Sequence, residues 1–341
     1  MAMETISTLG GSENDVSDSN NNIPGPSAAS LRESSSANTA AVTKNANVTI
    51  PTIDMTAHPK PIIAEQMWNA AHTVGFFTII NHGISEHDID SIFDLSKTFF
   101  DQPRTTKNRV PFDRDRNSGY EYMTQAPAST KTMDQKESMQ ITAREGCMDG
   151  LWPEHPANFR NDVEGLMVKT HALACSILSL LEPYACPHLQ PGTLAGSHRL
   201  WKEDGQCTLR LMHYPPVTLN NEDDDDDEDD DNNATPTPPS KNLWRAGAHT
   251  DWGCITLLFQ RLDQPGLECR ADPRGDALWI EVPPVANGGI TVNVGDMLQL
   301  WSGERLKSNM HRVRMPREEE GKKGRYSTAF FLQADGGARI E

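Results

Sequence analysis

The sequence predicts an α+β protein with a mostly β core and a helix-rich N-terminal part. Two observations lead to this prediction. Residues 61–74, 86–102 and 160–183 carry apolar side chains at helical spacing. From about residue 205 onward, short strand-like runs recur between turn-forming Pro and Gly residues, a pattern typical of a β-sandwich or barrel.

The N-terminal, helix-rich region covers residues 48–200, and five elements are expected in it. They are a strand within 48–55, a helix over 61–74, a short buried strand over 75–85, a helix over 86–102 and a long helix over 160–183. The second strand ends at the turn formers Asn81 and Gly83. Residues 104–150 are polar and irregular, so no regular element is predicted there.

The C-terminal region, residues 201–341, carries the expected β core. Its strand-like runs cover residues 207–214, 253–259, 278–282, 290–294, 297–301 and 326–332. An acidic insert over 218–242 interrupts them, and ten adjacent acids within it cannot be packed together. We therefore expect this insert to be a disordered, solvated excursion between strands.

Residues 1–47 are rich in Ser, Asn, Ala and Thr and are expected to be a disordered tail. Without the ten acids of residues 222–231, the formal net charge of −17 becomes −7, which argues against nucleic acid or an anionic membrane as partners. The six cysteines show no zinc-like spacing, which favours reduced thiols. With no signal sequence or membrane-length apolar run recognised, we expect a cytoplasmic monomer that acts on a small molecule.

The stretch RAGAHTDWG, residues 245–253, places His249 and Asp251 two residues apart beside an apolar run. On a strand these side chains face the same way, with their Cα atoms roughly 6.6 Å apart. His311, in KSNMHRV, is the candidate third ligand. Two histidines and one carboxylate that leave coordination positions open are the ligand set of non-haem Fe(II) oxygenases. The alternative is that the His-x-Asp pair is purely structural.

A second motif, GRYSTAFF at residues 324–331, places Arg325 and Ser327 on one face of an expected last strand. A guanidinium projecting into an apolar barrel requires an anion, and Arg favours carboxylates. Tyr214 could add a phenolic hydrogen bond to the same group. The alternatives are a surface position for Arg325 and a core position for Tyr214.

Taken together, these motifs resemble the Fe(II)- and 2-oxoglutarate-dependent dioxygenases of the isopenicillin N synthase-like family. The matching stretches run in order from about Ile50 to Ser327. They include GFFTIINHGIS, FFDQP, Asp134-x-Lys136-Glu137, HTDWGCITLLFQ, PGLECR, VNVGDMLQLWSGERLKSNMHRV and RYS. The resemblance implies a double-stranded β-helix, or jelly roll, flanked by N-terminal helices.

The resemblance also implies roles for individual residues. It implies that His249, Asp251 and His311 hold Fe(II). It implies that 2-oxoglutarate chelates the iron through its keto acid end while Arg325 and Ser327 hold its far carboxylate. Tyr214 stands where the family often has a tyrosine that helps to bind this carboxylate. The family often has Asn two residues earlier, where this chain has Met212.

The implied reaction uses O2 and 2-oxoglutarate to hydroxylate, desaturate or cyclise a small organic molecule, with release of succinate and CO2. Secondary metabolism is one expected setting. Tyr120 and Tyr122 are possible substrate-pocket residues, although an exposed loop is an equal alternative. Two other functions remain open: an Fe(II) oxidase of the same fold that uses no 2-oxoglutarate, and a non-catalytic jelly roll that binds a metal or ligand.

Overall fold

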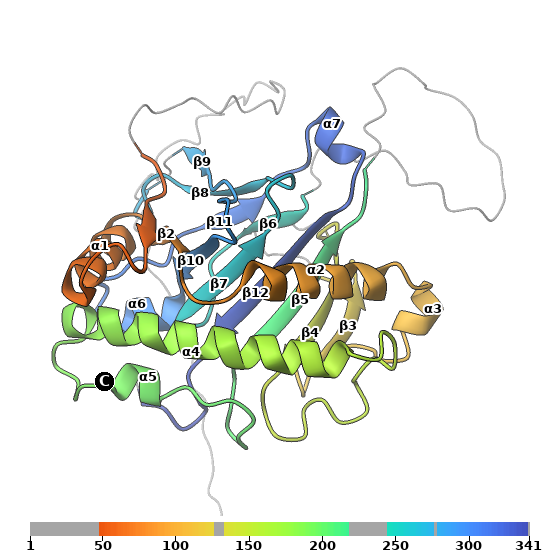
Figure 1. Ribbon diagram of the computed structural model, residues 1–341, viewed down its shortest axis with the longest axis horizontal. Helices are drawn as coiled ribbons and strands as arrows, with labels where there is room; N and C mark the ends of the chain where they lie inside the picture. The colour runs from red at the N-terminus through yellow and green to blue at the C-terminus, as the bar shows by residue number, and fades with distance from the viewer. Residues whose placement is uncertain (1–47, 126–132, 218–243, 276–277, 340–341) are drawn as a thin grey trace, which may run out of the picture. The chain divides into compact units, whose positions relative to one another are not determined.

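A computed structural model describes residues 48–125, 133–217, 244–275 and 278–339 (Figure 1). The tail expected over 1–47 and the acidic insert expected over 218–242 both lie outside the described residues. The boundary expected near residue 200 stays a prediction, and the main sheet contains strands from both sides of it.

The N-terminal half contains the five predicted elements and several short ones that were not predicted. They are β1 (Thr52–Asp54), α1 (Lys60–Thr73), β2 (Phe76–Ile80), α2 (Glu86–Phe100), α3 (Arg104–Lys107), β3 (Gly119–Tyr122), β4 (Glu137–Thr142), α4 (Phe159–Ala185) and α5 (Thr193–Gly196). The prediction that 104–150 lacks regular structure was wrong. All six residues of β4 are buried although four are polar, because hydrogen bonds satisfy them, and this polarity hides the strand in the sequence.

The C-terminal half contains, within the described residues, the remaining strands and two short helices. They are β5 (Thr208–Tyr214), β6 (Ala246–His249), β7 (Ile255–Gln260), β8 (Leu267–Arg270), β9 (Trp279–Glu281), β10 (Ile290–Val294), α6 (Asp296–Trp301), β11 (His311–Val313), α7 (Glu318–Gly321) and β12 (Arg325–Leu332). The strand predicted over 297–301 was wrong, because these residues form α6. Leu298 and Trp301 are its buried residues, three positions apart, but a run of five residues is too short to reveal helical spacing.

Two sheets form the predicted jelly roll. The eight-stranded sheet has the order β1-β2-β10-β7-β12-β5-β4-β3, and the four-stranded sheet has the order β6-β11-β8-β9. Helices α2 and α4 run across one face of the large sheet and contact β12 (Figure 1). The small sheet carries the strands that end or begin at the two candidate histidines, so the space between the sheets is where the site lies.

Strand alternation sorts the side chains of β12 between two environments. Phe330 and Leu332 pack in the large core, together with side chains of the helices. Arg325, Ser327 and Ala329 instead line the space between the two sheets. Since successive residues of a strand face opposite ways, one eight-residue strand supplies both the core and the site.

Helix α4 is long and apolar enough, by length and composition alone, to cross a membrane. In this structure it contacts α1, α2, β7 and β12, and its buried side chains belong to the large core. The helix therefore has an apolar face that the fold itself covers.

All six cysteines are unpaired, as the sequence predicted. Burial raises the pKa of the Cys207 thiol to about 12, and burial does the same for Cys269. These thiols stay protonated at neutral pH and act as small apolar side chains of the core.

Candidate active site

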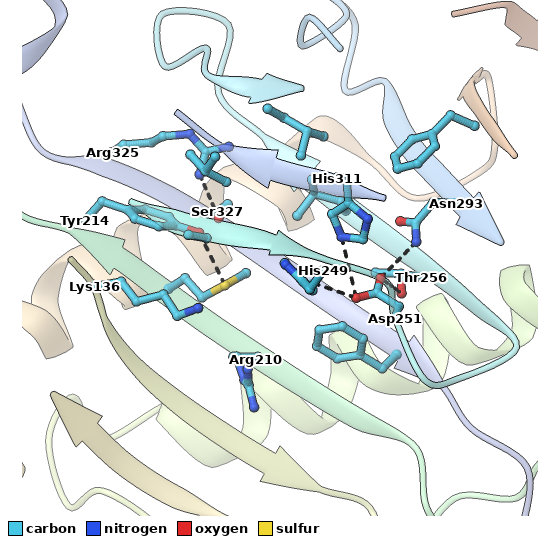
Figure 2. A pocket seen from close by; sticks show the side chains of 18 residues that line it. Lys136, Arg210, Tyr214, His249, Asp251, Thr256, Asn293, His311, Arg325 and Ser327 are labelled. Atoms are coloured by element: carbon cyan, nitrogen blue, oxygen red, sulfur yellow. Dashed lines mark hydrogen bonds and ion pairs between the residues drawn. The ribbon is translucent and has the colours of Figure 1, made fainter. Parts of the chain in front are cut away.

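A cavity of about 70 Å³ lies between the large and small sheets and is lined by all the residues predicted to bind iron or 2-oxoglutarate (Figure 2). The six predicted site residues lie toward two ends of this cavity. Arg325, Tyr214 and Ser327 lie at one end, and the two histidines with Asp251 lie at the other (Figure 2). Apolar side chains contribute most of the remaining wall, among them Phe76, Leu258, Leu267, Val313 and Phe331.

His249, Asp251 and His311 each offer one ligand atom, and these atoms all lie within 4.8 Å of one another. Asp251 Oδ1 is 3.5 Å from His311 Nε2 and 3.7 Å from His249 Nε2. Antiparallel pairing of β6 with β11 places His249 opposite His311. Asp251 lies beyond the end of β6, so a turn and not strand alternation brings it to the site.

Hydrogen bonds orient each of these three side chains. Asp251 Oδ2 accepts bonds from Thr256 Oγ1 at 2.6 Å and from Asn293 Nδ2 at 2.8 Å, which leaves Oδ1 toward the histidines. His249 Nδ1 lies 2.7 Å from the carbonyl oxygen of Gly247, and His311 Nδ1 lies 3.1 Å from a carbonyl oxygen as well. A carbonyl only accepts, so each Nδ1 carries a proton, and each Nε2 is the nitrogen that would bind a metal.

The charge states of the three groups follow from burial and from one another. Burial lowers the pKa of His249 to about 4, and the neighbouring His311 acts in the same direction. Burial alone would raise the pKa of Asp251, but the charges and hydrogen bonds of the histidines and Thr256 hold it below its usual range. His249 is therefore neutral and Asp251 ionised at neutral pH, as metal ligands must be.

Asp296 joins the two loops that carry the ligand residues. Its carboxylate accepts hydrogen bonds from Thr250 Oγ1 at 3.0 Å and from Ser308 Oγ at 2.5 Å. Gly295, just before it, passes so close to Gly253 that a Cβ atom would lie 2.2 Å from that residue's carbonyl oxygen. Only glycine permits this approach, which fixes the Asp251 turn against the start of α6.

The other end of the cavity holds a buried cation. Arg325 is 1% exposed and donates hydrogen bonds of 3.1 Å to Ser327 Oγ, Gln260 Oε1 and the carbonyl oxygen of Gln264. All three acceptors are neutral, and burial lowers the pKa of Arg325. The predicted pairing of Arg325 with Ser327 on one strand face is confirmed. None of the three described acceptors is a carboxylate, so none of them neutralises the charge of the guanidinium.

Tyr214 lies opposite Arg325 in the β5–β12 pairing and lines the cavity. The guanidinium carbon of Arg325 is 5.0 Å from the centre of its ring. Its hydroxyl group donates a weak bond of 3.7 Å to the sulfur atom of Met212. Met212, which stands where the family often has Asn, therefore contacts the hydroxyl group of Tyr214 directly.

Thr256 and Asn293 were not identified as site residues from the sequence, and neither were Lys136 or Arg210, which also line the cavity. Lys136 forms a buried ion pair of 2.8 Å with Asp134. The sequence offers these two residues only as part of the family pattern, without a role. Thr256 and Asn293 also fall within quoted family stretches, but no local signal gives them or Arg210 a role, because that role depends on which strands lie side by side.

Tyr120 and Tyr122 do not line this cavity. They line a second cavity of about 570 Å³, and Arg210 lines both cavities. The hydroxyl of Tyr120 donates to Glu137 Oε2 at 2.5 Å, within a buried network that includes Lys107. Burial is the main reason that the pKa of Tyr120 is raised.

Comparison with known proteins identifies the family. Residues 50–161 match the N-terminal domain described as non-haem dioxygenase in morphine synthesis, and residues 205–334 match the 2OG-Fe(II) oxygenase superfamily. The second match contains all six predicted site residues. The chain belongs to the 2OG-Fe(II) oxygenase superfamily.

Relatives and solved structures of this superfamily cover most of the chain. The 2-oxoglutarate-dependent dioxygenase caaD of Aspergillus niger is 30% identical over 285 residues, 78% of this chain and 80% of that protein. The 2-oxoglutarate-dependent dioxygenase tropC of Talaromyces stipitatus is 29% identical over 320 residues, 86% and 88% of the two chains. A full-length Neurospora crassa protein, solved in complex with alpha-KG, aligns with a TM-score of 0.70 and 26% identity, over 88% and 90%.

This oxygenase is an Fe(II)- and 2-oxoglutarate-dependent dioxygenase that acts on a small organic molecule. The donor atoms of His249, Asp251 and His311 suit ferrous iron, since two imidazole nitrogens and one carboxylate oxygen lie within 4.8 Å of one another. The buried cation at the second end suits the far carboxylate of the co-substrate. The residues present therefore fit both groups.

Proposed function

We propose that His249, Asp251 and His311 bind the iron and that Arg325 and Ser327, with Tyr214 beside them, bind the far carboxylate of 2-oxoglutarate. One observation carries the proposal: three oriented ligand atoms and an unneutralised buried guanidinium lie at opposite ends of one cavity. Thr256 contacts Asp251 and Gln260 contacts Arg325, and these two residues are four apart on β7. Their Cα atoms are thus roughly 13 Å apart, a gap that the inward-reaching side chains shorten.

Bound ferrous iron and 2-oxoglutarate supply O2 activation, coupled to decarboxylation of the co-substrate to succinate and CO2. The chain positions both groups and the substrate. Asn293 and Thr256 hold the Asp251 carboxylate, and backbone carbonyls hold the two imidazoles. The apolar wall between the two ends keeps water from the reacting atoms.

We infer that the substrate is a small organic molecule of secondary metabolism, hydroxylated, desaturated or cyclised in the cavity. The named fungal dioxygenases, and the Neurospora crassa protein in its complex with alpha-KG and thymine, support a free small molecule as substrate. The net charge of −17 supports the further proposal that nucleic acid and anionic membranes are not partners. We also propose that the enzyme acts as a monomer in the cytoplasm.

The decisive experiment measures succinate release by the Fe(II)-loaded full-length chain against a library of small molecules, with and without added 2-oxoglutarate. We expect a true substrate to stimulate succinate formation in equal amount to product. Oxygen consumption without 2-oxoglutarate would favour the oxidase instead. If iron or 2-oxoglutarate fails to bind under anaerobic conditions, the alternative of a non-catalytic binding protein is favoured.

A further inference from the structure

Arg245, immediately before β6, is a buried cation with no assigned role. It is 3% exposed, and neither its Nε nor its Nη2 atom has a hydrogen-bond partner within the described ranges. An unpaired buried guanidinium is costly, since burial removes its water without replacing the lost hydrogen bonds. Its retention in the fold calls for an anion that is supplied from elsewhere.

Arg245 lies close to the co-substrate end of the cavity without lining it. Its guanidinium carbon is 6.0 Å from the centre of the Tyr214 ring, and that of Arg325 is 5.0 Å from the same ring. Tyr214 lines the cavity, whereas Arg245 does not. Both guanidinium carbons therefore lie within 6.0 Å of the centre of one aromatic ring, and of the two arginines only Arg325 lines the cavity.

The surrounding charges leave this pair of cations unneutralised. Burial lowers the pKa of Arg245 to about 10, and the positive charge of Arg325 acts in the same direction. Glu320 acts in the opposite direction, but its two carboxylate oxygens bond to Arg314 at 2.6 and 3.1 Å. Two like charges in a poorly solvated region repel each other unless an anion lies between or beside them.

We propose that Arg245 is a positioning residue for the co-substrate, whose charge close to the Tyr214 ring reinforces Arg325 in holding the far carboxylate of 2-oxoglutarate. This inference rests on the proposed function. Arg325 provides the directional hydrogen bonds, and Arg245 provides a second positive charge at longer range. The arrangement also compensates for Met212, whose sulfur atom offers no hydrogen-bond donor to a carboxylate.

The test compares two keto acids on the Fe(II)-loaded, full-length enzyme without oxygen. One is 2-oxoglutarate, and the other is 2-oxopentanoate, in which a methyl group replaces the far carboxylate. Dissociation constants come from the visible charge-transfer absorption of the iron complex. For Arg245→Met we expect the constant for 2-oxoglutarate to rise on the order of tenfold while that for 2-oxopentanoate is unchanged. Arg245→Lys should stay close to the parent enzyme.

A second readout separates this role from a structural one. Because Arg245 has unpaired donors, Arg245→Met should not lower the melting temperature without co-substrate, but should reduce the rise in melting temperature that 2-oxoglutarate causes. Arg305→Met, which removes a cation stacked on Trp68, is the matched control and should leave both dissociation constants unchanged.

Results that overturn the role of Arg245 differ from results that overturn the proposed function. Equal weakening of both keto acids by Arg245→Met, or no weakening of either, overturns the role of Arg245. If the parent enzyme binds the two keto acids equally well, the assignment of Arg325 itself is wrong and this inference is overturned with it.

Discussion

The two ends of the cavity differ in whether their polar side chains already have hydrogen-bond partners of the right charge. At the iron end, the second polar atom of each ligand residue already has a partner: Thr256 and Asn293 for Asp251, and backbone carbonyls for His249 and His311. At the co-substrate end, Arg325 bonds only to neutral groups, and the described chain gives two nitrogens of Arg245 no partner.

This difference indicates what each end contributes to binding. The iron end is electrostatically balanced, with an ionised Asp251 beside His311, so its selectivity rests on geometry and on the freed lone pairs. The proposed co-substrate end carries excess positive charge, so we expect its affinity to rest on neutralisation by an anion. Substitutions at the iron end should therefore impair metal binding, and substitutions at the co-substrate end should impair 2-oxoglutarate binding.

The largest effect is expected at the iron end. His249→Ala removes one of three ligand atoms and should abolish both iron binding and turnover while the fold survives. Calorimetric titration with Co(II) and a melting curve check the two halves of this prediction. His171→Ala, outside the site, is the control, because that histidine bonds to the carbonyl oxygen of His198. Normal metal affinity in the His249 variant would contradict the assignment.

At the other end, Arg325→Ala should leave iron binding intact and raise the required 2-oxoglutarate concentration by about two orders of magnitude, since a buried carboxylate loses a charged partner. Steady-state kinetics at varied 2-oxoglutarate measure this shift. If the Arg325→Ala variant needs no more 2-oxoglutarate than the parent enzyme, Arg325 does not bind the co-substrate.

The next largest effect tests whether orientation matters at the iron end. Asn293→Ala removes one of two bonds to Asp251 Oδ2 and should weaken metal binding roughly 10- to 100-fold. Co-substrate affinity measured at saturating iron should not change. Loss of co-substrate affinity with normal metal affinity would reverse the roles given to the two ends.

A pH dependence should also be confined to the iron end. Burial alone would lower the pKa of His311, but the charge and hydrogen bond of Asp251 raise it above the ordinary value. The charged form stabilises the metal-free protein below the ordinary pKa, and this contribution disappears as pH rises through the raised value. A metal must displace that proton, so Co(II) affinity should rise about tenfold per pH unit and level off above the raised pKa. Calorimetry at several pH values checks this, and a flat profile would refute it.

The smallest effect is expected for Tyr214→Phe. The hydroxyl group donates a weak bond to Met212 and also interacts with the already buried Arg325 side chain, so its loss should raise the 2-oxoglutarate requirement by only about threefold. The double variant with Met212→Asn sharpens the comparison, because an amide could donate to the carboxylate in place of the hydroxyl. A much larger loss for Tyr214→Phe would mean that the phenol, and not the guanidinium, dominates binding.

Much of the site could be predicted because its chemistry is carried by short local patterns. Arg325 and Ser327 share a face since the period of a strand is two residues, and the structure confirms that spacing. The same reasoning failed for Asp251, which reaches the site through a turn held by Gly295 and Asp296. It also failed for β4, because its polar composition hides the alternation of a strand, and for α6, because six residues are too few to show helical periodicity.

By itself, the sequence determined the long helices, the alternating strands and the identities of the three proposed iron ligands and of the proposed cationic binding residue. Each of these depends on side-chain chemistry and on spacing within a few residues. The tertiary structure alone decided that β6 pairs with β11, that Asn293 orients Asp251, and that Arg245, with two nitrogens lacking a described partner, lies close to Tyr214. Those facts depend on contacts between segments distant in the chain, for which local periodicity carries no information.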